Sequence, residues 1–283
     1  MKGPLVTTDQ LLEWSRENPE GLAIIDCRYD LQDHLLGFFA YRESHIPGAV
    51  YCQLNQDLAA KPGEQTGRHP LPSLDELEHA MGKLGVTMEK KVVVYDDKGG
   101  AFAGRLWWVL RYLGHPQVYL LDGGIPKWIA EEKPLKEGIE EGKGHVFKSF
   151  PRQSLLVTKE EILEKLQSPL MLLVDARAPE RYKGEVEPID PVAGHIPGAK
   201  NLFYQWNLDE HGCFRPKEEL LELYSSVIGE VEPSQVVFYC GSGVTSCLNL
   251  IAMEYLELYG ARLYVGSWSE WCRTPHLPKV FKE

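Results

Sequence analysis

The sequence predicts an α/β protein built from two copies of one unit, each a parallel sheet flanked by helices. Four blocks recur in the same order about 150 residues apart, and a period this long indicates a duplicated domain rather than a solenoid. Strands are predicted to alternate with helices, which is typical of parallel sheets. The length of 283 residues also suits two domains. The repeated blocks are VTTDQLL and VTKEEIL, IIDCR and LVDAR, HIPGA twice, and VVVYD and VVFYC.

Each copy is predicted to open with a helix, at Thr7 or Thr158. Gln10 and Glu161, three residues later, complete the pattern of a capping box. Short apolar runs follow, and these suit strands that are buried on both faces of a sheet. The later elements are expected in the same order in both copies: strands at 22–25 and 171–174, strands at 49–52 and 199–203 after HIPGA, helices at 73–85 and 216–228, strands at 91–95 and 235–239, long helices at 103–113 and 245–259, and last strands at 118–121 and 263–265.

We expect an N-terminal domain at 1–135 and a C-terminal domain at 154–283. Residues 136–153 lack periodicity and are rich in lysine, glutamate and glycine, so they are predicted to be the linker.

The composition indicates an ordinary soluble globular protein, with 43% hydrophobic and 25% charged residues. A net charge of −11 argues against nucleic acid or an anionic membrane as a partner. No long apolar run or signal core is present, so a cytoplasmic protein is expected. Six cysteines without a C-x-x-C pair favour neither a disulfide scaffold nor structural zinc.

The two copies differ at the end of the third predicted strand, where Asp96 in the first copy aligns with Cys240 in the second. Small residues after Cys240 allow backbone N–H groups to turn toward one point, and a helix follows. Both features favour a thiolate, so we expect a lowered pKa and a nucleophilic sulfur. The alternative is a buried core cysteine followed by a tight turn.

Three reactions use a cysteine in a loop between a strand and a helix. Cysteine phosphatases need an arginine six residues after the cysteine, and Ser246 stands there instead. Thiol–disulfide exchange needs a second cysteine, for which Cys247 is a candidate, although helix packing is the favoured role of Cys247. Sulfur transfer through a persulfide needs one thiolate and a loop that holds an anion.

The segment CGSGVTSC at 240–247 resembles the active loop of 3-mercaptopyruvate sulfurtransferases, within the tandem-domain rhodanese superfamily. The doubled HIPGA and the D-x-R strand ends are similar to the domain markers of that superfamily. The resemblance implies two rhodanese-like domains, a catalytic C-terminal domain, and no metal or organic cofactor. It also implies a small-molecule sulfur donor, 3-mercaptopyruvate or thiosulfate, and an acceptor that is cyanide or a thiol such as thioredoxin.

The same resemblance implies roles for individual residues. Cys240 would be the nucleophile and persulfide carrier, and Ser242 would act in a relay with His69 and Asp57. By strict spacing Asn55 occupies the position of that aspartate, so the third member stays open between Asn55 and Asp57. The substrate-binding loop would comprise Gly241, Gly243, Val244, Thr245 and Ser246.

Members of the family hold the donor carboxylate with two arginines. Arg181 matches the first, but Asp190 stands at the second position and has the wrong charge. If Asp190 faces the donor, Asp190→Arg should improve the use of 3-mercaptopyruvate. Arg28 and Arg177 occur in both copies, so we expect them to form structural ion pairs.

Two other functions remain open. Gly241 and Ser242 after the cysteine are typical of enzymes that use 3-mercaptopyruvate, but a thiosulfate-specific sulfurtransferase is the alternative within the enzyme class. A non-catalytic persulfide carrier or sensor is the alternative outside it.

Overall fold

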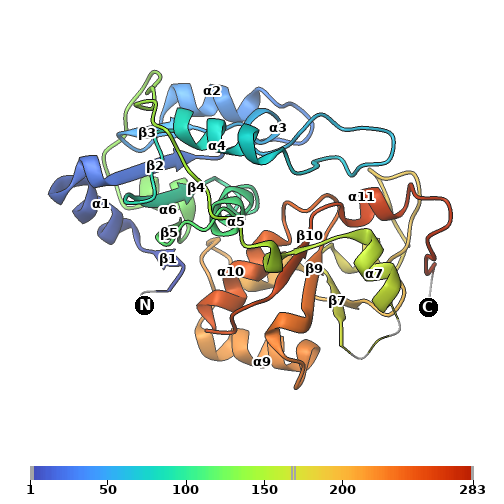
Figure 1. Ribbon diagram of the computed structural model, residues 1–283. Helices are drawn as coiled ribbons and strands as arrows, with labels where there is room; N and C mark the ends of the chain where they lie inside the picture. The colour runs from blue at the N-terminus through green and yellow to red at the C-terminus, as the bar shows by residue number, and fades with distance from the viewer. Residues whose placement is uncertain (1–2, 167, 169, 282–283) are drawn as a thin grey trace. The chain divides into compact units, whose positions relative to one another are not determined.

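The chain divides into two compact units in the computed structural model, which describes residues 3–166, 168 and 170–281 (Figure 1). The first unit holds the described residues up to Ala60, with Pro72–Arg152 and Leu208–Phe214. The second holds Lys61–Leu71, Gln153–Asn207 and the described residues from Arg215 onward. Two short segments, Lys61–Leu71 and Leu208–Phe214, therefore belong to a different unit from the residues that flank them in the sequence. The domain limits predicted from the sequence stay a proposal.

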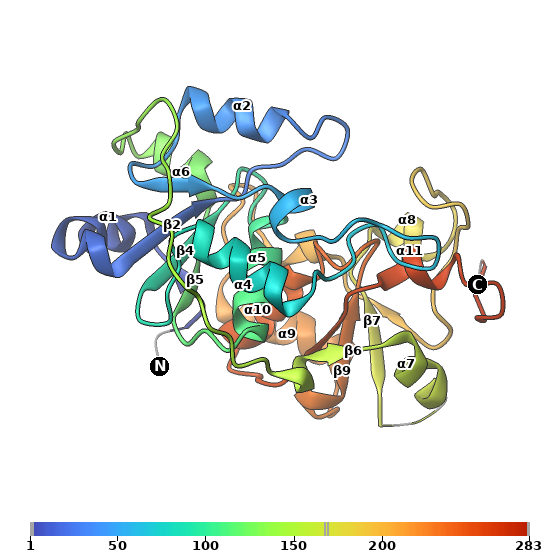
Figure 2. The ribbon, with the colours of Figure 1, turned by 45° about the horizontal axis from the view of Figure 1, so that its top comes forward.

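The described residues of the first unit form a five-stranded parallel sheet in the order β1-β5-β4-β2-β3. The adjacent strands β2, β4 and β5 can be followed in Figure 2. The strands are β1 (Leu5–Val6), β2 (Leu22–Asp26), β3 (Ala49–Tyr51), β4 (Lys91–Tyr95) and β5 (Val118–Leu121). The helices are α1 (Thr8–Glu17), the 3₁₀ turn η1 (Pro19–Gly21), α2 (Leu36–Glu43), α3 (Leu54–Asp57), α4 (Leu74–Lys83), α5 (Ala103–Tyr112) and α6 (Gly124–Ala130).

The described residues of the second unit repeat this topology in a sheet of order β6-β10-β9-β7-β8, also parallel and five-stranded. The strands are β6 (Leu156–Val157), β7 (Leu172–Asp175), β8 (Lys200–Asn201), β9 (Val236–Tyr239) and β10 (Arg262–Tyr264). The helices are η2 (Gln153–Leu155), α7 (Lys159–Lys165), α8 (Pro179–Tyr182), η3 (Tyr204–Asn207), α9 (Lys217–Ile228), η4 (Pro233–Gln235), α10 (Cys247–Tyr255) and α11 (Ser267–Trp271).

The register of the strands confirms the duplication. Asp26 pairs with Tyr95 in the first sheet, and Asp175 pairs with Tyr239 in the second. The same aspartate–tyrosine rung therefore lies at the carboxyl end of the two central strands of each sheet. The next residue is Asp96 in one copy and Cys240 in the other.

The predicted strands are confirmed, but several elements were missed. The edge strands β1 and β6 have two residues each, which is too short to give a periodic signal. The last long helix was predicted at 245–259, whereas α10 runs from Cys247 to Tyr255. It begins later because residues 241–246 form the loop, and it ends before Glu257, which has a left-handed φ of 64°.

The predicted caps are half correct. The hydroxyls of Thr7 and Thr158 accept hydrogen bonds from the backbone N–H groups of Gln10 and Glu161, at 3.2 and 3.3 Å. The Glu161 carboxylate, however, bonds to Arg262 at 2.8 Å rather than completing a box. A complete capping box is present at Ser73 and Glu76, where α4 begins.

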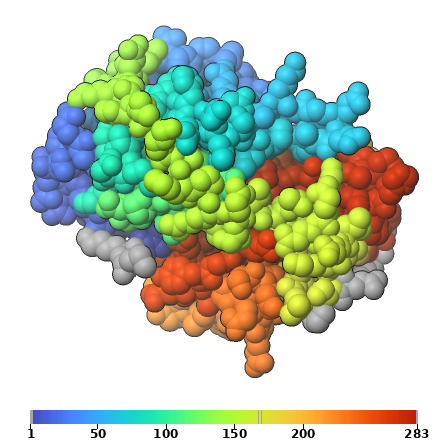
Figure 3. Space-filling model, in the orientation of Figure 1, coloured from blue at the N-terminus to red at the C-terminus, as the bar shows by residue number. Residues whose placement is uncertain are grey.

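The segment predicted as a linker follows the surface of the first unit, where it is drawn in yellow-green in Figure 3. Backbone hydrogen bonds join His145 to Gly82, Phe150 to Leu113, and Arg152 to Tyr112. In the described chain, residues 137–152 form neither a helix nor a strand. Separately, none of the helices in the described ranges is long and apolar enough to cross a membrane.

Candidate active site

The site centres on Cys240, which directly follows β9 in the middle of the second sheet. In a parallel sheet, the loops beyond the carboxyl ends of central strands converge on one place. The loop after β10 holds the cysteine from one side. Ser267 Oγ accepts a hydrogen bond from the Cys240 N–H at 3.2 Å, and the Cys240 carbonyl accepts one from the Trp268 N–H at 3.0 Å.

Ser267 is a functional candidate that the sequence did not reveal. Its φ is 55°, a left-handed conformation that is strained for a residue other than glycine. Its hydroxyl also donates to the carbonyl of Tyr264 at 2.9 Å, so this side chain ties the end of β10 to the backbone of Cys240. Such strain is typical of residues that position a site.

The surroundings of the Cys240 sulfur confirm the predicted lowering of its pKa. Burial raises the pKa of this thiol, but hydrogen bonds to the sulfur lower the pKa by more, so the net change is downward. The donors are the hydroxyls of Ser246 and Thr245 and the backbone N–H groups of Ser242 and Ser246. The buried Ser246 hydroxyl has no other hydrogen-bond partner among the described residues.

The shape of the loop depends on Gly243, which has a φ of 71°. A Cβ atom there would lie 2.4 Å from the carbonyl oxygen of Val265, so any larger residue would collide with the backbone after β10. Cys247, at the start of α10, is fully buried and donates from Sγ to the Gly243 carbonyl at 3.5 Å. This contact agrees with the predicted packing role of Cys247.

The corresponding loop of the first unit binds a carboxylate. The side chain of the buried Asp96 accepts four backbone hydrogen bonds, each 2.8 Å long. The donors are the N–H groups of Lys98, Gly100, Phe102 and Ala103. This loop is therefore an anion cradle filled by its own aspartate, which explains how one scaffold can carry a carboxylate in one copy and a thiolate in the other.

Two predicted relay residues come together in the second unit, where His69 Nδ1 lies 2.8 Å from Ser242 Oγ and both side chains are buried. The segment 61–71 that carries His69 is held against the loop after β10. A Cβ on Gly67 would lie 2.5 Å from the Gly266 carbonyl oxygen, and the Arg68 N–H donates to Ser269 Oγ at 3.0 Å.

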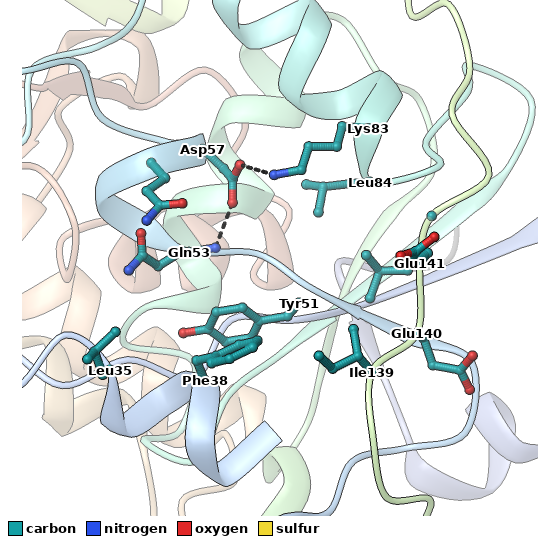
Figure 4. Close-up of a pocket in the computed structure, with 13 residues that line it drawn as sticks. Leu35, Phe38, Tyr51, Gln53, Asp57, Lys83, Leu84, Ile139, Glu140 and Glu141 are labelled. Carbon is teal, nitrogen blue, oxygen red and sulfur yellow. Dashed lines mark hydrogen bonds and ion pairs between the residues drawn. The ribbon is translucent and has the colours of Figure 1, made fainter. Parts of the chain in front are cut away.

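Asp57 lies in the first unit, at the end of α3. Figure 4 shows its carboxylate between the backbone N–H of Gln53, at 2.7 Å, and Lys83 Nζ, at 3.6 Å. These groups line a cavity of about 570 Å³. The Asn55 amide donates to the hydroxyl of Tyr29 at 2.6 Å. The identity of the third relay member therefore stays a prediction.

Arg181 is joined by an arginine that sequence reasoning missed, Arg68. Both guanidinium groups form ion pairs with Asp190, Arg68 through Nη1 and Arg181 through Nη2 at 3.5 Å. Arg181 also bonds to Glu187 at 2.6 Å. The carboxylate of Asp190 is therefore wholly buried and forms ion pairs with two arginines. The sequence feature that could have pointed to Arg68 is its position directly before His69.

Arg28 and Arg177 form the predicted structural ion pairs. Each guanidinium bonds in a fork to the aspartate two residues earlier, with Nη2 2.6 Å from the carboxylate of Asp26 or Asp175. Both pairs are buried, and the copy without the thiol has the same arrangement as the copy with it. In the described part of the chain, no three histidine, cysteine, aspartate or glutamate side chains are grouped as metal ligands.

The fold and the site define an α/β protein with a buried cysteine of lowered pKa in a loop at the carboxyl end of a parallel sheet. Comparison with known proteins identifies the family: the model of the rhodanese-like domain matches residues 7–131 and 158–274. A probable 3-mercaptopyruvate sulfurtransferase of Pseudomonas aeruginosa is 43% identical over 276 residues, 97% of this chain and 96% of that protein.

Other relatives agree with this match. The thiosulfate sulfurtransferase of Rattus norvegicus is 34% identical and is aligned over 95% of this chain and 92% of its own length. The solved structure of the 3-mercaptopyruvate sulfurtransferase from Leishmania major has a TM-score of 0.82 and 30% identity, over 95% of this chain and 74% of that one. The chain belongs to the rhodanese family and is a sulfurtransferase with two rhodanese domains.

Proposed function

We propose that this enzyme moves a sulfur atom from 3-mercaptopyruvate to a thiol acceptor through a persulfide on Cys240. The observation that carries the proposal is the Cys240 sulfur itself. It lies in a ring of hydroxyl and backbone N–H donors that lower the pKa of the thiol. Such a ring stabilises both the attacking thiolate and the persulfide anion that replaces it.

In the first half-reaction, the Cys240 thiolate attacks the sulfur of 3-mercaptopyruvate. An S–S bond forms, the C–S bond breaks, and the electron pair of that bond leaves on the enolate of pyruvate. The sulfur arrives with its own hydrogen, so the enzyme then carries Cys–S–SH. The enolate takes one proton to become pyruvate.

The contact between Ser242 and His69 supports 3-mercaptopyruvate as the donor. A carbanionic leaving group needs a proton, and a hydroxyl hydrogen-bonded to an imidazole at 2.8 Å can relay one. Thiosulfate is a second candidate donor because relatives of both kinds cover nearly the whole chain. Sulfite, its leaving group, departs with the electron pair and needs no proton.

In the second half-reaction, a thiol acceptor takes the outer sulfur. The acceptor thiolate attacks the outer sulfur, and the S–S bond between that sulfur and Sγ of Cys240 breaks. Cys240 is thereby restored as a thiolate. A protein thiol such as thioredoxin and the cyanide ion are both nucleophiles of the required kind, and cyanide would leave as thiocyanate. Each acceptor returns the enzyme to its starting state.

The test follows sulfur by intact mass after addition of 3-mercaptopyruvate, and in parallel after thiosulfate. The wild-type protein should gain one sulfur atom that maps to Cys240. Cys240→Ser should gain none. Cys247→Ser is the matched control and should gain the sulfur as the wild type does. A sulfur found on Cys247, or on neither residue, would refute the assignment.

The same assay addresses the alternative of a non-catalytic persulfide carrier. Turnover of pyruvate with cyanide or a small thiol as acceptor supports catalysis. A persulfide that forms once and is stable to both acceptors would instead support a carrier that delivers sulfur to a protein partner.

A further inference from the structure

Two arginines flank the residue that directly follows the nucleophile. A Cβ atom on Gly241 would lie 2.7 Å from Nη2 of Arg68 and 3.7 Å from both Nη1 and Nη2 of Arg181. The two guanidinium groups come from different segments of the second unit, residues 61–71 and α8. The absence of a side chain at Gly241 therefore lets both guanidinium groups approach the backbone next to Cys240, where a larger residue would collide with Arg68.

Acidic residues hold both guanidinium groups but do not use all their donors. Arg68 is paired through Nη1 with Asp190, and Arg181 is paired through Nε and Nη2 with Glu187 and through Nη2 with Asp190. Within the described residues, Nη2 of Arg68 and Nη1 of Arg181 have no acceptor. These two groups are among the three atoms that would lie nearest to a Cβ on Gly241.

We infer that Arg68 and Arg181 together bind the anionic end of the sulfur donor beside Cys240, and that Asp190 positions Arg68 for this role. This inference rests on the proposed function. Guanidinium groups recognise carboxylates and oxyanions through forked, charge-assisted hydrogen bonds. Two such groups with free N–H donors one residue from the nucleophile would place the donor sulfur at Cys240.

The role of Asp190 follows from its contacts. Its carboxylate is buried between two cations, so it offsets their mutual repulsion and fixes the orientation of Arg68. An aspartate at this position therefore does not oppose the binding of an anion. By pairing with Arg68, Asp190 holds a residue from a distant part of the sequence at the site.

The test compares Arg68→Gln and Arg68→Lys with the wild type. For 3-mercaptopyruvate, KM should rise about tenfold or more in Arg68→Gln, with a smaller change in kcat, because one charged hydrogen-bond donor is lost. Arg68→Lys keeps the charge but not the forked hydrogen bonds, so its KM should lie between those of the wild type and Arg68→Gln. Arg215→Gln is the matched control, since Arg215 is a partly exposed residue of the same unit that pairs with Glu219.

A neutral donor separates anion binding from a structural role. 1-Mercapto-2-propanone has the thiol and carbonyl of 3-mercaptopyruvate but no carboxylate, so its kcat/KM should change less than about twofold in Arg68→Gln. An equal loss with this donor, or an unchanged KM for both anionic donors, would overturn the inference. A rise in KM for 3-mercaptopyruvate alone assigns the site to carboxylates, and a rise for thiosulfate as well assigns it to both anions.

A binding experiment distinguishes failure of the inference from failure of the proposed function. Calorimetry with pyruvate, which cannot donate sulfur, would use Cys240→Ser with and without Arg68→Gln. The Kd should weaken about tenfold when Arg68 is replaced. If the wild type takes up no sulfur but this difference in Kd is present, the anion site is supported and the proposed sulfur transfer is refuted. If sulfur transfer occurs and the Kd is unchanged, only the inference about Arg68 is refuted.

Discussion

Nδ1 of His69 lies 2.8 Å from Oγ of Ser242, although 173 residues separate the two in the chain. Both side chains are buried, and Ser242 is two residues after Cys240, the proposed nucleophile. A hydrogen bond of this length between an imidazole and a hydroxyl provides a path for one proton. We therefore expect the pair to distinguish sulfur donors by whether their leaving group needs that proton.

We predict that His69→Asn and Ser242→Ala lower kcat with 3-mercaptopyruvate by about 100-fold, because the pyruvate enolate is no longer protonated by the enzyme. With thiosulfate, kcat should fall less than about threefold, since sulfite leaves as an anion. Steady-state kinetics with both donors measure this, with His276→Asn at an exposed position as the control. Equal losses with the two donors would contradict the relay.

The pH dependence of Cys240 should reflect its hydrogen bonds. Its pKa is lowered, so the thiolate should form at a lower pH than in a free cysteine, and iodoacetamide labelling should rise with pH through that lower value. Cys213 offers a comparison in the same chain, because burial and then the nearby Asp122 raise its pKa. Mass mapping of labelled cysteines against pH should place the Cys240 midpoint below that of Cys213.

Removing one donor to the sulfur should weaken this effect. Ser246→Ala deletes a buried hydroxyl that donates to Cys240 and should lower the rate of labelling at pH 7 about tenfold, since a hydrogen bond to a charged group contributes about 1.5–3 kcal/mol. Ser226→Ala, on the exposed face of α9, serves as the control. A labelling rate unchanged in Ser246→Ala would show that this hydroxyl does not stabilise the thiolate.

Gly243 and Gly198 form a matched pair for stability. Their φ values are 71° and 76°, so alanine is strained at both. At Gly198, however, nothing lies within 4 Å of an added Cβ, whereas at Gly243 the Val265 carbonyl is 2.4 Å away. Gly198→Ala should lower the free energy of unfolding by about 1 kcal/mol, and Gly243→Ala by about 3 kcal/mol or more.

Urea unfolding measures both variants, and the sulfur uptake of Gly243→Ala should fall as well because the cradle around Cys240 is displaced. Similar unfolding midpoints for the two variants would mean that the loop yields to the added methyl group.

Asp190→Asn should raise KM for 3-mercaptopyruvate severalfold while kcat changes little, because Arg68 loses the carboxylate that orients it. Asp190→Arg should be worse rather than better. It would place a third guanidinium beside Arg68 and Arg181, and breaking a buried ion pair costs about 3 kcal/mol of stability or more. Kinetics and thermal unfolding measure these effects. Improved use of 3-mercaptopyruvate by Asp190→Arg would contradict the assigned role of Asp190.

Much of the fold was predictable because it is encoded in short segments that occur twice. A buried parallel strand needs only four or five consecutive apolar residues, and an N-cap needs only one hydroxyl, at Thr7 or Thr158. Comparison of the two copies then pointed to Cys240, since the thiol stands where the other copy has Asp96. The ion pairs of Arg28 and Arg177 were predictable for the same reason, because each partner lies two residues away.

The tertiary structure decided which charges surround the cysteine. The sequence alone suggested that an aspartate at position 190 spoils an arginine pair, because it gives charge and order but not neighbours. In the folded second unit, Asp190 binds Arg68, a residue 122 positions earlier. Ser267 likewise gained its role only when β10 brought it to the backbone of Cys240. Contacts between distant segments depend on how the whole chain packs, and no local pattern of residues records them.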